Sequence, residues 1–359
     1  MMLDYGRLPN NKYMINWPGN GNDIYLNVVE MSREQRAAEL QKARNKTLGF
    51  IYYIQTELGF KHLAPADDEF TTDDRLAYVP YHREGRRLDG VVRFTFNHVA
   101  EPYQQSDMLY RTGISVGDYP VDHHHKCNPS PPDVHFLPVP SFCVPLGSLI
   151  PETIDGLIVS DKAISVTNLI NGATRLQPVV MLTGQAAGVL AALSIIEQKS
   201  PREISVRDVQ QKLLDASAYI MPLYDVKPDN PHFQAIQRIT ATGILKTQGE
   251  PYAWANRTWF YPDNSITANE FYEGLKSYGY PVADKSDDKL MTIGKCVEIL
   301  SSLKDYDLTE EVKTDWVNIS QRSYQPDVPA TKQEIAALVD RTLNPFNMQI
   351  DNRGFIIKN

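Results

Sequence analysis

The stretch NGATRLQPVVMLTGQAAGVLAAL, residues 171–193, decides how this sequence folds. Its Asn-Gly pair predicts a turn, and the apolar run that starts near Val179 predicts a helix. Gly184 and Gly188, with the alanines between and after them, place small side chains on one side of that helix. A neighbouring helix or a flat ligand could therefore approach its backbone closely. On composition alone, an Ala-rich core helix is the simpler interpretation.

Arg175 and Gln177 come directly before this helix. The first N–H groups of a helix lack intrahelical partners and carry partial positive charge, so they attract anions and electron-rich ligand edges. If the helix begins between Pro178 and Gly184, its first amides and the Arg175 cation would meet such a ligand together.

Chain length, net charge and cysteine content limit the classes of function that this protein can have. The 359 residues are enough for about two domains, and the net charge of -8 argues against nucleic acid and anionic membranes as main partners. Cys127, Cys143 and Cys296 are far apart, so we expect neither a metal knuckle nor a disulfide framework. The N-terminus shows no signal peptide. Its loop-like composition suggests that the chain begins inside a larger protein.

The apolar run from Val179 to Ile196 is barely long enough to cross a membrane. Thr183, Gln185 and Ser194 interrupt it, and no basic flank marks a cytoplasmic side. We therefore expect no membrane span.

The rest of the first half reads as a mixture of helix and strand. A capping box of Ser32 and Gln35 begins a helix predicted over 32–58, and strands are expected within 78–125, with 91–99 alternating and 113–125 extended. The proline-rich segment 128–151 predicts a loop with short extended pieces, and a short buried strand is expected at the start of 156–165. Between about 200 and 225 the sequence pattern changes to polar, capped helices joined by loops. This change predicts two domains, 1–205 and 206–359.

Four segments resemble, in order and spacing, the C-terminal part of a family of FAD-dependent oxidoreductases. The most specific feature is an R-x-Q-P turn at 175–178 followed by a GQAAG helix at 184–188. The four segments are YVPYHREGRRLDG (78–90), GISVGDYPVDHHH (113–125), PSFCVPLGSLIPETIDGLIV (140–159) and GLIVSDKAIS through GQAAGVLAAL (156–193). The resemblance covers roughly residues 5 to 200.

The resemblance implies an FAD cofactor and an α+β fold. The chain would comprise a truncated FAD-oxidoreductase, made of a flavin-facing segment and a β-sheet substrate domain, followed by a small, mainly α-helical domain. The residues implied to lie near the flavin are Arg175, Gln177, Leu182, Thr183, Gly184, Gln185 and Asp161. Asp161 and Lys162 replace the family's Gly-Arg, and 145–147 depart from its Tyr-Arg.

The dinucleotide fingerprint of such enzymes is an apolar strand, then GxGxxG, then a helix. The chain has only WPGNGND near its start, where Gly19 and Gly21 follow no predicted strand. We therefore expect that the ADP-binding half is missing, and that an N-terminal FAD-binding segment would be a partner.

The run Asp122-His123-His124-His125 supplies the candidate catalytic groups. By the resemblance it forms a substrate-side wall, in which His124 or Asp122 handles a proton and His123 contacts the substrate. A solvated strand end is an equally open interpretation. His123 and His125 share a face and could bind a metal with His135 or Asp133, but we expect no metal.

Arg83 and Arg87 belong to a charged cluster in the segment 78–90. They could bind an anionic or hydroxylated substrate, although an internal network of ion pairs is the simpler reading.

The second half resembles the S-layer homology repeat. Residues 232–275 predict a helix that ends at Gly243 and a second helix near Thr267, with Glu270 at capping-box distance. A weaker copy at 290–343 carries Thr331 and Glu334. The wall-binding arginine of the repeat is replaced by Ala268 and Lys332, so a helical accessory domain is the alternative to wall binding.

These observations predict an FAD-dependent oxidoreductase that transfers hydride between flavin and an unknown small molecule or carbohydrate, with a sugar or polyol as the suggested substrate. The alternatives are a non-catalytic carbohydrate or cell-envelope binding protein and a polysaccharide lyase. A periplasmic or cell-envelope location follows only from the second resemblance.

Overall fold

The computed structural model describes residues 2–17, 21–123, 137–282 and 288–357. Its contacts divide these residues into two compact units, one before and one after the junction at 86/87. The boundary predicted at 205/206 stays a prediction.

The first unit is built around one long helix. Its elements are α1 Met2–Tyr5, β1 Arg7–Leu8, β2 Lys12–Tyr13 and α2 Arg33–Thr56. The predicted capping box is confirmed, since the Ser32 hydroxyl accepts from the Gln35 amide and the Gln35 side chain accepts from the Ser32 amide. The Arg44 guanidinium pairs with the Asp74 carboxylate, which connects α2 to the segment that follows it in the chain.

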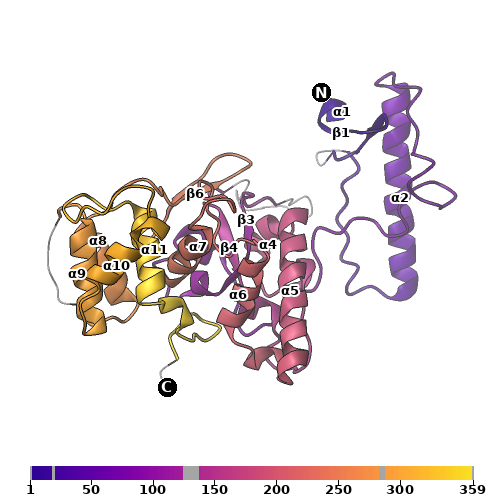
Figure 1. The fold of residues 1–359 in the computed structure, drawn as a ribbon. Coiled ribbons are helices and arrows are strands. Elements are labelled where there is room, and N and C mark those ends of the chain that lie inside the picture. Colours follow the sequence, from indigo (N-terminus) through magenta and orange to yellow (C-terminus); the bar gives the residue numbers. More distant parts are fainter. Residues whose placement is uncertain (1, 18–20, 124–136, 283–287, 358–359) are drawn as a thin grey trace. The chain divides into compact units, whose positions relative to one another are not determined.

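The second unit is α+β with small sheets (Figure 1). Its elements are α3 Phe96–Ala100, β3 Gly113–Gly117, β4 Phe142–Pro145, α4 Asn168–Thr174, α5 Gln177–Glu197, α6 Val206–Asp215, α7 Phe233–Thr242, β5 Gln248–Glu250, β6 Arg257–Trp259, α8 Ala268–Ser277, α9 Ile293–Lys304, α10 Thr309–Asp315 and α11 Lys332–Thr342.

The antiparallel pair β3–β4 lies at the centre of this unit, and α5 and α6 pack beside it (Figure 1). Val179, Thr183, Ala186 and Leu190 of α5 are buried at intervals of three or four residues, as a helix packed through one face requires. The Thr183 hydroxyl lies 3.1 Å from that of Ser115 on β3, so this position of α5 faces the sheet.

α5 is the one helix in the described ranges that is long and apolar enough to cross a membrane, with a mean hydropathy of 2.0 over its most apolar window. Only 28% of that window is buried in the structure. Core helices of soluble proteins have the same length and composition, so the expected lack of a membrane span stays a prediction.

Three local predictions are wrong. Residues 96–100 form a helix instead of the end of a strand, because Thr95 and His98 make a capping box. Asn171 and Gly172 lie inside α4 and form no turn. The strand expected at the start of 156–165 is absent from the structure, which has only a short 3-10 turn, Asp161–Ala163, in that segment.

Three of the C-terminal helices begin with the same kind of N-cap. α8, α9 and α11 begin after Thr267, Thr292 and Thr331, whose hydroxyls each accept a hydrogen bond from a backbone amide three residues on. Their leading segments lie side by side, since Thr267 pairs with Leu290 and Thr292 with Pro329. The predicted capping box of Thr267 and Glu270 is confirmed, and Thr331 and Glu334 form another. The resemblance to the S-layer homology repeat stays a prediction.

Candidate functional site

A buried ion pair joins a predicted catalytic residue to a predicted cofactor residue. Arg175 Nη2 lies 2.7 Å from Asp122 Oδ2, and the two side chains are only 7% and 9% exposed. Arg175 caps the C-terminus of α4, whereas Asp122 follows β3 in the chain. The structure thus brings together two residues that are 53 positions apart, and each fixes the orientation of the other.

The backbone of α4 packs closely against Asp122 and His123. A Cβ atom on Gly172 would lie 2.7 Å from the Asp122 carbonyl oxygen and 2.8 Å from His123 Nε2. His123 Nε2 lies 2.9 Å from the Leu169 carbonyl oxygen, so the ring packs on α4. Glycine is therefore required at 172 by close approach, and His123, predicted to contact substrate, is 6% exposed.

The predicted cofactor residues on α5 do not share one face. The helix begins at Gln177, with Pro178 in its first turn. The amides of Leu182, Thr183, Gly184 and Gln185 are therefore inside the helix. Thr183 points to the sheet, whereas Gly184 and Gln185 are exposed. A ligand on this helix would meet the first turn and the Gly184 face.

Asp161 adopts a conformation that favours glycine. Its φ is +62°, in the left-handed region, at the start of a 3-10 turn that packs against α5. Asp and Asn tolerate this region better than other residues with a Cβ, because their short polar side chains bond locally. Here Asp161 Oδ1 accepts from the Lys162 amide at 2.7 Å. The resemblance places a glycine at this position, and the backbone shape explains it.

The other predicted substrate-binding residues fall in different units. Arg83 lies in the first unit and Arg87 in the second. His124, His125, Asp133 and His135 lie outside the described residues, so the proposed proton transfer by His124 and the metal hypothesis stay untested. No cluster of three metal-ligating side chains occurs in the described ranges.

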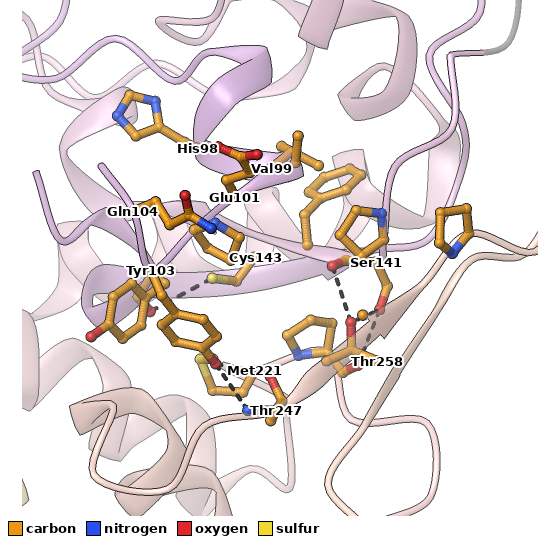
Figure 2. Close-up of a pocket in the computed structure, with 18 of the residues that line it drawn as sticks. His98, Val99, Glu101, Tyr103, Gln104, Ser141, Cys143, Met221, Thr247 and Thr258 are labelled. Atoms are coloured by element: carbon orange, nitrogen blue, oxygen red, sulfur yellow. Dashed lines mark hydrogen bonds between the residues drawn. The ribbon is translucent and has the colours of Figure 1, made fainter. Parts of the chain in front are cut away.

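A cavity of about 360 Å³ opens in the second unit, beside β4 (Figure 2). Its lining comes from the α3 region, β4, the segment around Met221, and β5–β6. The polar lining residues are His98, Glu101, Tyr103, Gln104, Ser141, Cys143, Thr247 and Thr258. Ser141 donates to the Thr258 hydroxyl at 2.7 Å, which ties β4 to β6.

Burial shifts the pKa values of three titratable groups that line this cavity. Burial raises the pKa of the Tyr103 hydroxyl to about 12 and that of the Cys143 thiol to about 12. Burial also lowers the pKa of His98, against a weaker opposing effect of Asp107. Neither a thiolate nor a phenolate is therefore present near neutral pH, and the carboxyl group of Glu101 also lines the cavity.

His98 is oriented as a donor. Its Nδ1 lies 3.2 Å from the Thr95 amide, which can only donate, so Nδ1 accepts and the ring proton resides on Nε2. The ring lines the cavity at one end (Figure 2). A neutral imidazole in this tautomer can donate a hydrogen bond to a ligand oxygen.

Sequence reasoning missed this cavity. Its lining is drawn from segments on both sides of the predicted 205/206 boundary, and apolar strand residues carry no sequence signal for a pocket. The TFNH capping box at 95–98 was the one available sign that His98 is held in place.

Comparison with protein families gives one match. The model described as FAD dependent oxidoreductase matches residues 1–213, which is more than half of the chain. The chain belongs to the FAD dependent oxidoreductase family. Comparison with curated proteins and with solved structures gives no match. Family membership supports a general oxidoreductase function and FAD as the cofactor.

Proposed function

We propose that this chain is the flavin-facing and substrate-side part of an enzyme that transfers hydride between FAD and a hydroxylated small molecule, with a sugar or polyol as the first candidates. The observation that carries the proposal is the left-handed turn at Asp161, packed against α5 next to the helix that ends at Arg175. It reproduces, in backbone shape, a position where the family pattern has glycine.

The residues present fit one end of the cofactor. The Asp161 turn, the first turn of α5 and the exposed Gly184 would hold the flavin ring, since a Cβ on Gly184 would meet nothing within 4 Å. A bound flavin supplies the hydride acceptor and donor atom. Arg175, whose guanidinium is fixed by Asp122, would place positive charge near the ring edge where negative charge develops on reduction. Asp122 then acts as a positioning residue.

The ADP end of the cofactor needs further residues. Among the described residues, no strand leads through a glycine-rich turn into a helix. We propose that a separate FAD-binding segment packs on the exposed face of α5. The small side chains there, with Gly188 also open, leave room for a close neighbour.

The substrate proposal rests on the hydrogen-bonding groups that line the cavity. Its hydroxyl, amide and imidazole groups suit a polyhydroxylated ligand, and Phe94 and Phe142 offer apolar surface for the ring carbons. His98 would donate from Nε2 to a substrate oxygen.

The first test is the visible absorption spectrum of the purified chain, followed by titration with FAD and with FMN. We expect saturable FAD binding that Arg175→Lys weakens, with Arg202→Lys as the matched control at an exposed ion pair. Circular dichroism would show that both variants fold. A folded chain that binds no flavin, alone or with an added FAD-binding segment, would refute the proposal.

The second test addresses the substrate. With a flavin-loaded enzyme and an artificial electron acceptor, sugars and polyols would be screened for oxidation. His98→Phe should raise KM for the active compound without loss of bound flavin. Release of unsaturated products from acidic polysaccharide would instead favour a lyase.

A further inference from the structure

The strand β6 presents a second surface on the side opposite to the cavity. Side chains alternate along a strand, so Thr258 and Phe260 are buried while Arg257, Trp259 and Tyr261 face outward. Tyr224 and Tyr252 come alongside from neighbouring segments. We call these five outward residues, Tyr224, Tyr252, Arg257, Trp259 and Tyr261, the aromatic platform.

The rings of the platform are held in fixed positions. Trp259 and Tyr261 are nearly parallel, with ring centres 5.7 Å apart and planes 8° apart, and Tyr224 meets Trp259 edge-on at 5.0 Å. The Trp259 Nε1–H donates to Glu250 at 2.7 Å, which fixes the indole. Asp225 accepts the amides of Phe260 and Tyr261 at 2.9 and 2.7 Å, which fixes the backbone below.

The platform remains accessible although it is ordered. Tyr224 is 47% exposed, Tyr252 51% and Tyr261 37%. Tyr261 also has a φ of +58°, a strained conformation for a bulky residue. Exposed, rigid and strained aromatic side chains gain nothing for the isolated fold, and such patches mark binding surfaces.

Arg257 lies in the middle of the rings. Its guanidinium carbon is 3.7 Å from the centre of the Tyr252 ring and 4.8 Å from that of Tyr224. In the part of the chain that the structure describes, its buried Nε has no hydrogen-bond partner. The exposed Lys227 adds a second cation, 5.1 Å from the Tyr224 ring.

This combination specifies a ligand class. Aromatic faces carry negative charge density and pack on the C–H groups of a pyranose ring, whereas a planar guanidinium recognises a carboxylate through paired hydrogen bonds. The two nearby carboxylates, Glu250 and Asp225, are already engaged by N–H donors. We propose that the aromatic platform binds a carboxylate-bearing glycan, with sugar rings on Trp259 and the tyrosines and the carboxylate on Arg257.

The site lies apart from the proposed flavin residues and does not depend on them. It would tether the chain to an acidic polysaccharide while the cavity remains on the inner side of β6.

The test is titration of the full chain with tri-galacturonate, followed by tryptophan fluorescence and calorimetry, with cellotriose, poly-glutamate and single-stranded DNA as comparison probes. We expect binding of the acidic trisaccharide that exceeds each comparison probe by at least about tenfold. Arg257→Gln and Trp259→Ala should each weaken it by about tenfold or more. Arg353→Gln and Tyr306→Ala, at exposed positions outside the platform, should leave it unchanged.

Tyr224→Ala keeps the test valid if Trp259→Ala fails to fold, because the Tyr224 side chain is more exposed than that of Trp259. Equal binding of cellotriose, or an unchanged affinity in Arg257→Gln, would overturn the acidic specificity. Stronger binding of poly-glutamate or DNA, or no binding of any glycan, would overturn the proposal altogether.

Discussion

At the scale of single residues, the buried pair Arg175–Asp122 allows a prediction about stability. Breaking a buried pair leaves an uncompensated charge, at a cost of about 3–5 kcal/mol. We expect Arg175→Met to lose stability of this order, whereas Arg175→Met combined with Asp122→Leu should lose clearly less. Urea unfolding of the three proteins measures this. If the double variant is no more stable than the single one, the pair does not carry the effect.

Asp161 allows a second prediction at this scale. A residue with a branched Cβ in the left-handed region costs roughly 1–2 kcal/mol, and glycine costs nothing there. Asp161→Val should therefore lower the thermal stability, while Asp161→Gly should preserve or raise it. The opposite order would show that the side-chain hydrogen bond to Lys162 matters more than the backbone conformation.

At the scale of elements, glycines on two neighbouring helices should respond in opposite ways. Gly172→Ala places a Cβ 2.7 Å from the Asp122 carbonyl oxygen, which must displace backbone and cost about 1–3 kcal/mol. Gly188→Ala meets nothing within 4 Å and should stabilise α5 by up to about 1 kcal/mol. Calorimetric melting of both variants tests this. Similar losses in both would mean that the α5 face is covered in the folded chain.

Lys332, the first residue of α11, should make the folding stability depend on pH. Burial lowers the pKa of Lys332 to about 8 from its ordinary value of 10.5, against weaker opposing effects of Glu270 and Asp225. Between these values the unfolded chain binds a proton that the folded chain lacks, so stability rises with pH over that window and the penalty is complete below it. Stability of the native chain relative to Lys332→Met should therefore increase from pH 8 to pH 10. A flat difference would refute the shift.

At the scale of the whole molecule, the second unit has a continuous core. On α6, Gln210 donates to the carbonyl oxygens of Arg111 and Gly113 at 2.9 Å each, and Val209 and Leu213 are buried. We expect residues 87–359 to unfold in one cooperative transition, and 206–359 alone to lose stability because α6 no longer packs on β3. Two separate transitions in calorimetry would instead support the predicted domain boundary.

Local chemistry alone made several features of this protein predictable. The capping boxes at Ser32, Thr267 and Thr331 follow from side chains three residues apart, so sequence reveals them without any tertiary contact. The same holds for the long helix after Arg175 and for the R-x-Q-P and GQAAG motifs, on which the resemblance to the family depends.

Tertiary contacts decided the rest. The pairing of Arg175 with Asp122, the inward turn of Thr183 and the outward face of Gly184 depend on where α5 meets β3. The cavity and the aromatic platform use opposite faces of one short strand, whose side chains alternate. No sequence pattern reports such positions, because burial and ion pairing join segments that are distant along the chain.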